Sequence, residues 1–259
     1  GLLYASYEYY AKALSVAEKL KLTDQIAVLN SRLAWTAKQN YKYDVTLKHL
    51  EKASSAIKRS KITFPRSIIS NTYGAYYFAT DDYWKSLLNY HKSYSECLKY
   101  DQDFVTPVGN KGNMFLQLGY YKQAIKFCEI ALNVLRKKKK HYFSDLLLTT
   151  MAESYAALGE YKKSEECLNE IEVSENIKTN KFFSFNIHLF KVNNFVKKRQ
   201  FSKARDELEI IDNSKSSSDT LTYLAKANML KAEKLFKKAN IAIDKALHLY
   251  EKSGALGEK

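Results

Sequence analysis

Apolar residues recur along the chain at helical spacing, in short segments separated by polar turns. Around the middle of the chain, Thr106 can cap a first helix and Pro107 can sit in its first turn. Gly119 suits the left-handed residue that commonly ends a helix. A second segment begins near Tyr121, and its apolar side is formed by Ala124, Ile125, Cys128, Ala131, Leu132 and Leu135. The pattern predicts a pair of antiparallel helices joined by a tight turn.

The same pair recurs along the whole chain. An aromatic residue marks the start of each second helix, at Tyr7, Tyr43, Tyr83, Tyr121, Tyr161, Phe201 and Phe236. The steps of 36, 40, 38, 40, 40 and 35 residues differ from the unbroken heptad of a coiled coil. We therefore predict an all-α repeat protein of about six and a half helix pairs, a single array over residues 1–259. Its units cover roughly residues 1–24, 25–64, 65–102, 103–143, 144–180, 181–217 and 218–255.

Small residues stand where neighbouring helices must approach closely. Gly112, Ala124 and Ala131 are examples, and two helices packed in a hairpin leave no room there for large side chains. Small–aromatic pairs recur as Gly74/Tyr77, Gly112/Phe115 and Ala152/Tyr155, and the segment 118–124 returns almost residue for residue as 158–164. This pattern resembles the tetratricopeptide repeat (TPR). The resemblance implies a right-handed superhelical solenoid whose first helices line a concave surface that binds protein segments, without catalysis.

The positions expected on that concave surface carry several carboxamides. An asparagine amide both donates and accepts, so it can pair with the backbone of an extended peptide of any sequence. The alternative is that these residues are ordinary solvated helix positions. The candidate peptide-binding residues are Arg32, Trp35, Asn71, Asn110, Asn113, Gln117, Glu153, Asn193 and Asn228.

The chain is basic, with 42 Lys+Arg against 28 Asp+Glu and a formal charge of +14. Its densest basic run is Arg136, Lys137, Lys138, Lys139 and Lys140. Such a run can attract nucleic acid or an acidic partner, and it also suits the negative end of a helix dipole as a solvated helix end. Only six residues are arginine, which counts against direct reading of RNA or DNA bases.

No catalytic, metal-binding or cofactor motif is found. The five histidines are scattered and lack a second ligand at metal-like spacing, and three cysteines are expected as buried thiols. No apolar run is long enough to span a membrane. The chain begins at Gly1, so we expect a processed or expressed part of a longer protein whose cytoplasmic location is favoured. A periplasmic location stays open if a signal or anchor was removed.

The sequence therefore predicts a non-catalytic scaffold that binds a protein or peptide through its concave face. We expect it to be the interaction or sensory part of a bacterial signalling or transcription regulator, because similar arrays accompany such proteins. The alternative is a basic helical-repeat module that binds RNA or acidic surfaces through its lysine clusters.

Overall fold

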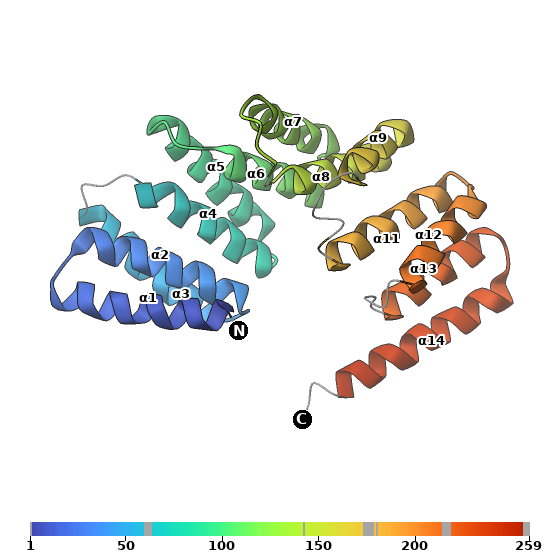
Figure 1. The fold of residues 1–259 in the computed structure, drawn as a ribbon, viewed down its shortest axis with the longest axis horizontal. Helices are drawn as coiled ribbons and strands as arrows, with labels where there is room; N and C mark the ends of the chain where they lie inside the picture. The colour runs from blue at the N-terminus through green and yellow to red at the C-terminus, as the bar shows by residue number, and fades with distance from the viewer. Residues whose placement is uncertain are drawn as a thin grey trace. The chain divides into compact units, whose positions relative to one another are not determined.

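The fold was obtained as a computed structural model that describes residues 2–59, 64–141, 143–172, 179, 181–213 and 219–255. Every regular element within these residues is an α-helix (Figure 1). The chain divides into two compact units, Gly1–Thr150 and Met151–Lys259, which are described separately.

The N-terminal unit is a stack of helical hairpins. Helices α2 and α3, α4 and α5, and α6 and α7 pair as antiparallel neighbours, and α1 packs against α2. Leu33, Leu50, Met114 and Leu135 are among its fully buried side chains. Its helices are α1 (Leu2–Lys19), α2 (Thr23–Gln39), α3 (Tyr43–Arg59), α4 (Phe64–Ala79), α5 (Tyr83–Lys99), α6 (Val105–Gln117), α7 (Tyr121–Lys137) and the start of α8 (Ser144–Ala157).

The C-terminal unit repeats the arrangement. Helix α11 pairs with α12 and α13 pairs with α14, and α13 also packs against α11. Phe185, Val192, Leu208, Ile211 and Met229 belong to one buried apolar cluster of these helices. The helices are the end of α8, α9 (Tyr161–Glu172), α11 (Lys181–Lys197), α12 (Phe201–Asn213), α13 (Asp219–Ala232) and α14 (Phe236–Ala255).

The aromatic markers of the repeat predict most helix starts correctly. Six of them are the first residues of α3, α5, α7, α9, α12 and α14. The prediction for Tyr7 is wrong, because α1 already begins at Leu2. A residue with positive φ stands two positions before each of these six helix starts. One of them is Gly119, with φ of +79°, which the sequence predicted to be left-handed. The other five are Tyr41, Asp81, Gly159, Arg199 and Lys234.

Four of these left-handed positions carry a side chain, which is unfavourable there because Cβ crowds the backbone. Lys234 has φ of 63° and an exposed side chain. We expect Lys234→Gly to raise the free energy of unfolding by about 1 kcal/mol, measured by urea denaturation and circular dichroism. Lys237→Gly, three residues later inside α14, is the control and should lower it. Equal losses in both variants would contradict the prediction.

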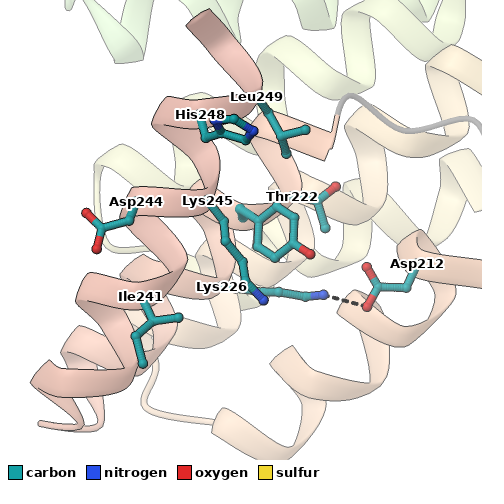
Figure 2. A pocket seen from close by; sticks show the side chains of 9 residues that line it. Asp212, Thr222, Lys226, Ile241, Asp244, Lys245, His248 and Leu249 are labelled. Atoms are coloured by element: carbon teal, nitrogen blue, oxygen red, sulfur yellow. Dashed lines mark hydrogen bonds and ion pairs between the residues drawn. The ribbon is translucent and has the colours of Figure 1, made fainter. Parts of the chain in front are cut away.

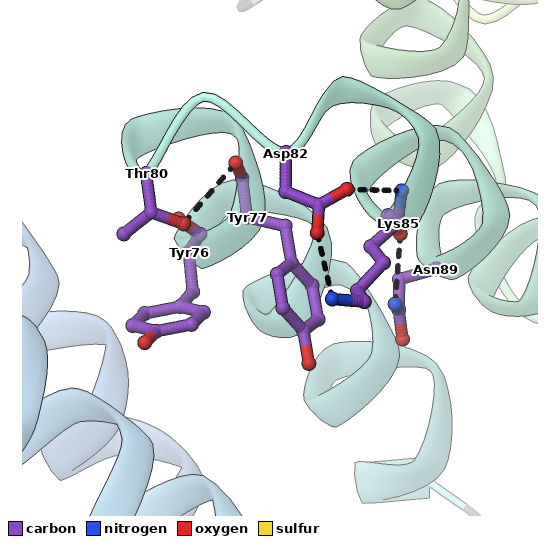
Figure 3. Close-up of polar contacts among 6 residues, drawn as sticks. All are labelled: Tyr76, Tyr77, Thr80, Asp82, Lys85 and Asn89. Atoms are coloured by element: carbon purple, nitrogen blue, oxygen red, sulfur yellow. Dashed lines mark hydrogen bonds and ion pairs between the residues drawn. The ribbon is translucent and has the colours of Figure 1, made fainter.

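Side chains accept hydrogen bonds from backbone N–H groups in the first turns of α5 and α6. The predicted cap at Thr106 is wrong: α6 begins at Val105, whose backbone N–H donates to Asp103 Oδ1 at 3.0 Å. A carboxylate outside the helix therefore takes the capping role. Asp82 caps α5 by accepting from the Lys85 backbone N–H at 3.1 Å, and its other oxygen lies 2.7 Å from Lys85 Nζ (Figure 3). These contacts with Lys85 hold the pKa of the Asp82 carboxyl below its usual value.

Candidate functional site

The N-terminal unit contains a groove of about 280 Å³ across the first helices of three successive hairpins. Helix α2 contributes Arg32 and Trp35, α4 contributes Asn71, and α6 contributes Thr106 and Pro107. Three residues predicted from the sequence therefore line one cavity. The remaining lining residues are Ser31, Ser67, Ile68, Thr72, Ser93, Cys97 and Asp103.

A hydrogen bond between two predicted carboxamides joins α4 to α6 beside this groove. Asn110 Nδ2 donates to Asn71 Oδ1 at 3.0 Å. Within the described residues, neither amide makes another hydrogen bond. The pair therefore keeps the N–H donors of Asn71 and the oxygen of Asn110 for a ligand. One donor beside one acceptor is what a peptide group requires.

Arg32 and Trp35 give the groove a cationic and aromatic end. Both side chains are exposed, Trp35 by 38 %. Arg32 makes no ion pair in the described part of the chain, so its guanidinium is available to a carboxylate. Lys38 Nζ lies 5.8 Å from the centroid of the Trp35 ring, and burial lowers the pKa of Lys38. This end suits an acidic or C-terminal group next to an apolar side chain.

The floor of the groove is fixed by hydrogen bonds that join α4 to α5 and to the loop after α5. Ser67 Oγ donates to Gln102 Oε1 at 2.6 Å, and Ser93 Oγ donates to the Ser67 carbonyl at 2.7 Å. The Cys97 thiol donates to the Asp103 carbonyl, and burial raises its pKa. The sequence predicted that Cys97 is a buried thiol. It did not predict that Cys97 and Asp103 line the groove, because the candidate residues were taken from first helices alone, whereas these two lie on a second helix and in a loop. A thiol of raised pKa is protonated and serves packing.

The other predicted residues lie outside this cavity. Asn113 and Gln117 continue along the face of α6 that carries Asn110; Asn113 is half-buried and Gln117 exposed. In the C-terminal unit, Asn193 is half-buried and Asn228 is exposed. Glu153 is half-buried, and burial raises the pKa of its carboxyl.

The predicted basic patch lies at the end of α7 and in the turn that follows. Arg136 and Lys137 end the helix, and Lys138 is the residue after it. All five side chains of the run are exposed, and Lys139 has φ of 51°. The four lysines form no ion pair with any described residue, so the run is an accessible cationic surface.

A wider cavity of about 590 Å³ opens between α12, α13 and α14 (Figure 2). Its central lysine is already engaged: Lys226 Nζ lies 2.6 Å from Asp212 Oδ2 and 5.3 Å from the ring of Tyr223. Lys245 Nζ lies 5.6 Å from the same ring. Asp244 also lines the cavity, so acidic and basic groups balance there.

Within the described residues, no group of three or more His, Cys, Asp or Glu side chains could hold a metal ion. None of the described helices is both long and apolar enough to cross a membrane. The three cysteines are buried thiols, as predicted.

Comparisons with solved structures identify proteins with a similar fold, whereas comparisons of the sequence find no match. No protein-family model matches the sequence, and no curated protein matches it. Among solved structures, the apo form of RapI is similar over 96 % of this chain and 99 % of that chain, with a TM-score of 0.71 and 12 % identity. Aspartyl phosphate phosphatase F from Bacillus subtilis has a TM-score of 0.71 at 12 % identity, over 94 % of this chain and 64 % of that chain.

The apo quorum sensor NprR from B. thuringiensis is also similar, with a TM-score of 0.70 and 13 % identity over 95 % of this chain and 75 % of that chain. NprR in complex with its cognate peptide NprX has a TM-score of 0.68 at 13 % identity, covering 95 % and 77 % of the two chains. At these identities the likeness concerns the fold. The described helices, their pairing and these similarities agree with the sequence pattern, and the chain has the TPR-like helical-repeat fold.

Proposed function

We propose that the groove across α2, α4 and α6 binds an extended peptide segment. The observation that carries the proposal is the Asn110–Asn71 hydrogen bond beside the cavity lined by Arg32 and Trp35. The amide pair offers a donor and an acceptor to the peptide backbone, and Arg32 offers a guanidinium to a carboxylate. Trp35 offers an aromatic face to an apolar side chain. Binding, without a reaction, is the activity that these groups support.

The peptide complex of NprR supports the proposal by analogy, since that protein has a similar fold. We further propose that this chain is the interaction or sensory part of a bacterial signalling or transcription regulator. Binding of a peptide across three successive hairpins would favour one arrangement of these hairpins, and this is how a signal would reach the rest of a regulator. One of the similar structures is named a phosphatase, aspartyl phosphate phosphatase F, but that name describes the other protein and we do not propose phosphatase activity for this chain.

The test is selection of peptides from a displayed random library on the intact chain, followed by calorimetry with the selected peptides. We expect the Asn71→Ala/Asn110→Ala double variant to weaken binding by at least about tenfold, because both backbone partners are lost. Asn133→Ala on the exposed side of α7 is the matched control and should bind normally. Equal affinity of the double variant would contradict the proposal.

The same experiment tests the alternative of binding through the basic patch. A variant with Lys137, Lys138, Lys139 and Lys140 changed to Gln should keep its peptide affinity in low and high salt. If the selected ligands are acidic, are lost in this variant and dissociate at modest salt, the lysine-driven alternative is correct and the groove proposal is wrong.

A further inference from the structure

The outward face of α5 carries an apolar stripe that no described residue covers. Trp84, Leu88 and Leu98 are exposed by 61 %, 65 % and 54 %. With His91 and Ser95 they follow the spacing i, i+4, i+7, i+11 and i+14, so the five side chains lie within an arc of about 80° on the helix. We call these five residues the α5 stripe. This is the spacing of a seam between two packed helices.

The α5 stripe differs from the equivalent positions of two other second helices in the N-terminal unit, α3 and α7. Each of those helices begins at an aromatic marker, so positions can be compared by their distance from it. The first, fifth and fifteenth positions after the marker are Trp84, Leu88 and Leu98 in α5. In α3 they are Asp44, Lys48 and Lys58, and in α7 they are Lys122, Lys126 and Arg136. A solvated face explains those two helices, and it does not explain α5.

A row of lysines runs along one edge of the α5 stripe. Lys85, Lys92 and Lys99 are exposed and recur every seven residues, so they stay beside the stripe along the whole helix. Figure 3 shows Lys85 held at the first turn by Asp82. An apolar seam flanked by one sign of charge selects a partner helix with the opposite charge. A second copy of this basic chain would place lysines against lysines.

The middle of the stripe adds a polar group. Lys111 Nζ lies 3.3 Å from His91 Nδ1. An ammonium only donates, so Nδ1 accepts and the His91 proton resides on Nε2. This N–H can donate to a carboxylate of the partner. Two polar residues in the centre also make the stripe less suited to insertion into a lipid surface, which requires a broad apolar face.

We propose that the α5 stripe binds an amphipathic helix of a partner protein, with apolar residues on the seam and acidic residues beside it. The interaction is independent of the peptide groove, because the α5 stripe lies on exposed positions of a second helix and none of its residues lines that cavity.

The probe is a synthetic three-heptad helical peptide with leucines along one seam and glutamates beside it, labelled for fluorescence anisotropy. We expect saturable binding, weakened by at least about tenfold in Leu88→Ala, which truncates the centre of the seam. Lys126→Ala, at the equivalent position of α7, is the matched control and should leave the affinity unchanged. A peptide with lysines in place of the glutamates should not bind.

Three results would overturn the proposal. The first is no binding of the acidic peptide, and the second is equal binding by Leu88→Ala and wild type. The third is Leu88-dependent binding to vesicles of phosphatidylcholine and phosphatidylglycerol without binding of the peptide, which would assign the stripe to a membrane surface. Because Leu88 is largely exposed, its truncation leaves the core intact, and circular dichroism provides the check.

Discussion

Gly112→Leu is expected to lower the free energy of unfolding of the N-terminal unit by about 2–3 kcal/mol. A Cβ atom at Gly112 would lie 2.6 Å from Cys128 Sγ and 3.2 Å from the Ala124 carbonyl oxygen. The thiol can move, but the carbonyl belongs to the backbone of α7, so the helices α6 and α7 must separate. Overpacking at this contact outweighs the better helix propensity of leucine.

Intrinsic fluorescence measures this loss in urea, because both tryptophans, Trp35 and Trp84, lie in the N-terminal unit. Gln117→Leu is the control: it introduces the same side chain on the same helix at an exposed position and should change stability by less than about 0.5 kcal/mol. Gly112→Ala should cost less in a Cys128→Ala background, where the closest atom is gone. An unchanged unfolding midpoint in Gly112→Leu would show that α6 and α7 do not pack at this residue.

The helix pairs were predictable because an aromatic residue marks the first position of six second helices, and this signal depends on nearby sequence alone. Positive φ was predictable at Gly119, where glycine favours it, but not at Tyr41, Asp81, Arg199 and Lys234, whose side chains disfavour it. The signal failed at Tyr7, where the apolar pattern continues upstream into the helix from Leu2. The separate prediction that Thr106 caps α6 was wrong, because the helix begins one residue earlier and its first N–H donates to the loop carboxylate of Asp103.

The candidate groove was predictable in part. Arg32 and Trp35 lie on α2 and Asn71 lies on α4, so stacking of the first helices of two successive hairpins brings the three residues to one surface. Cys97 and Asp103 reach the groove from a second helix and a loop, and only the packing of α4, α5 and α6 reveals them. The sequence analysis did not predict the α5 stripe. The sequence does indicate it, because at the same distances from the aromatic marker α5 carries apolar residues where α3 and α7 carry charged ones.

Removal of Glu207 is the second change with a large expected effect. His188 and Lys191 on α11 face Glu207 on α12, with distances of 2.6 Å from His188 Nδ1 to Oε2 and 3.7 Å from Lys191 Nζ to Oε1. The Lys191 side chain is only 8 % exposed, and those of His188 and Glu207 are each 14 % exposed. We expect Glu207→Ala to lower the free energy of unfolding of the C-terminal unit by about 3 kcal/mol, because it removes the carboxylate from a buried ammonium.

Circular dichroism in urea measures the loss, and two variants separate its causes. Glu209→Ala removes an exposed carboxylate from the same helix and should change stability by less than about 0.5 kcal/mol. Glu207→Gln keeps an acceptor for the His188 ring while removing the charge, so an intermediate loss is expected. If Glu207→Ala were as mild as Glu209→Ala, the ion pairs between α11 and α12 would contribute no more than a solvated surface pair. Burial of Lys191 would then depend on its other contacts and on the apolar cluster around Val192 and Leu208.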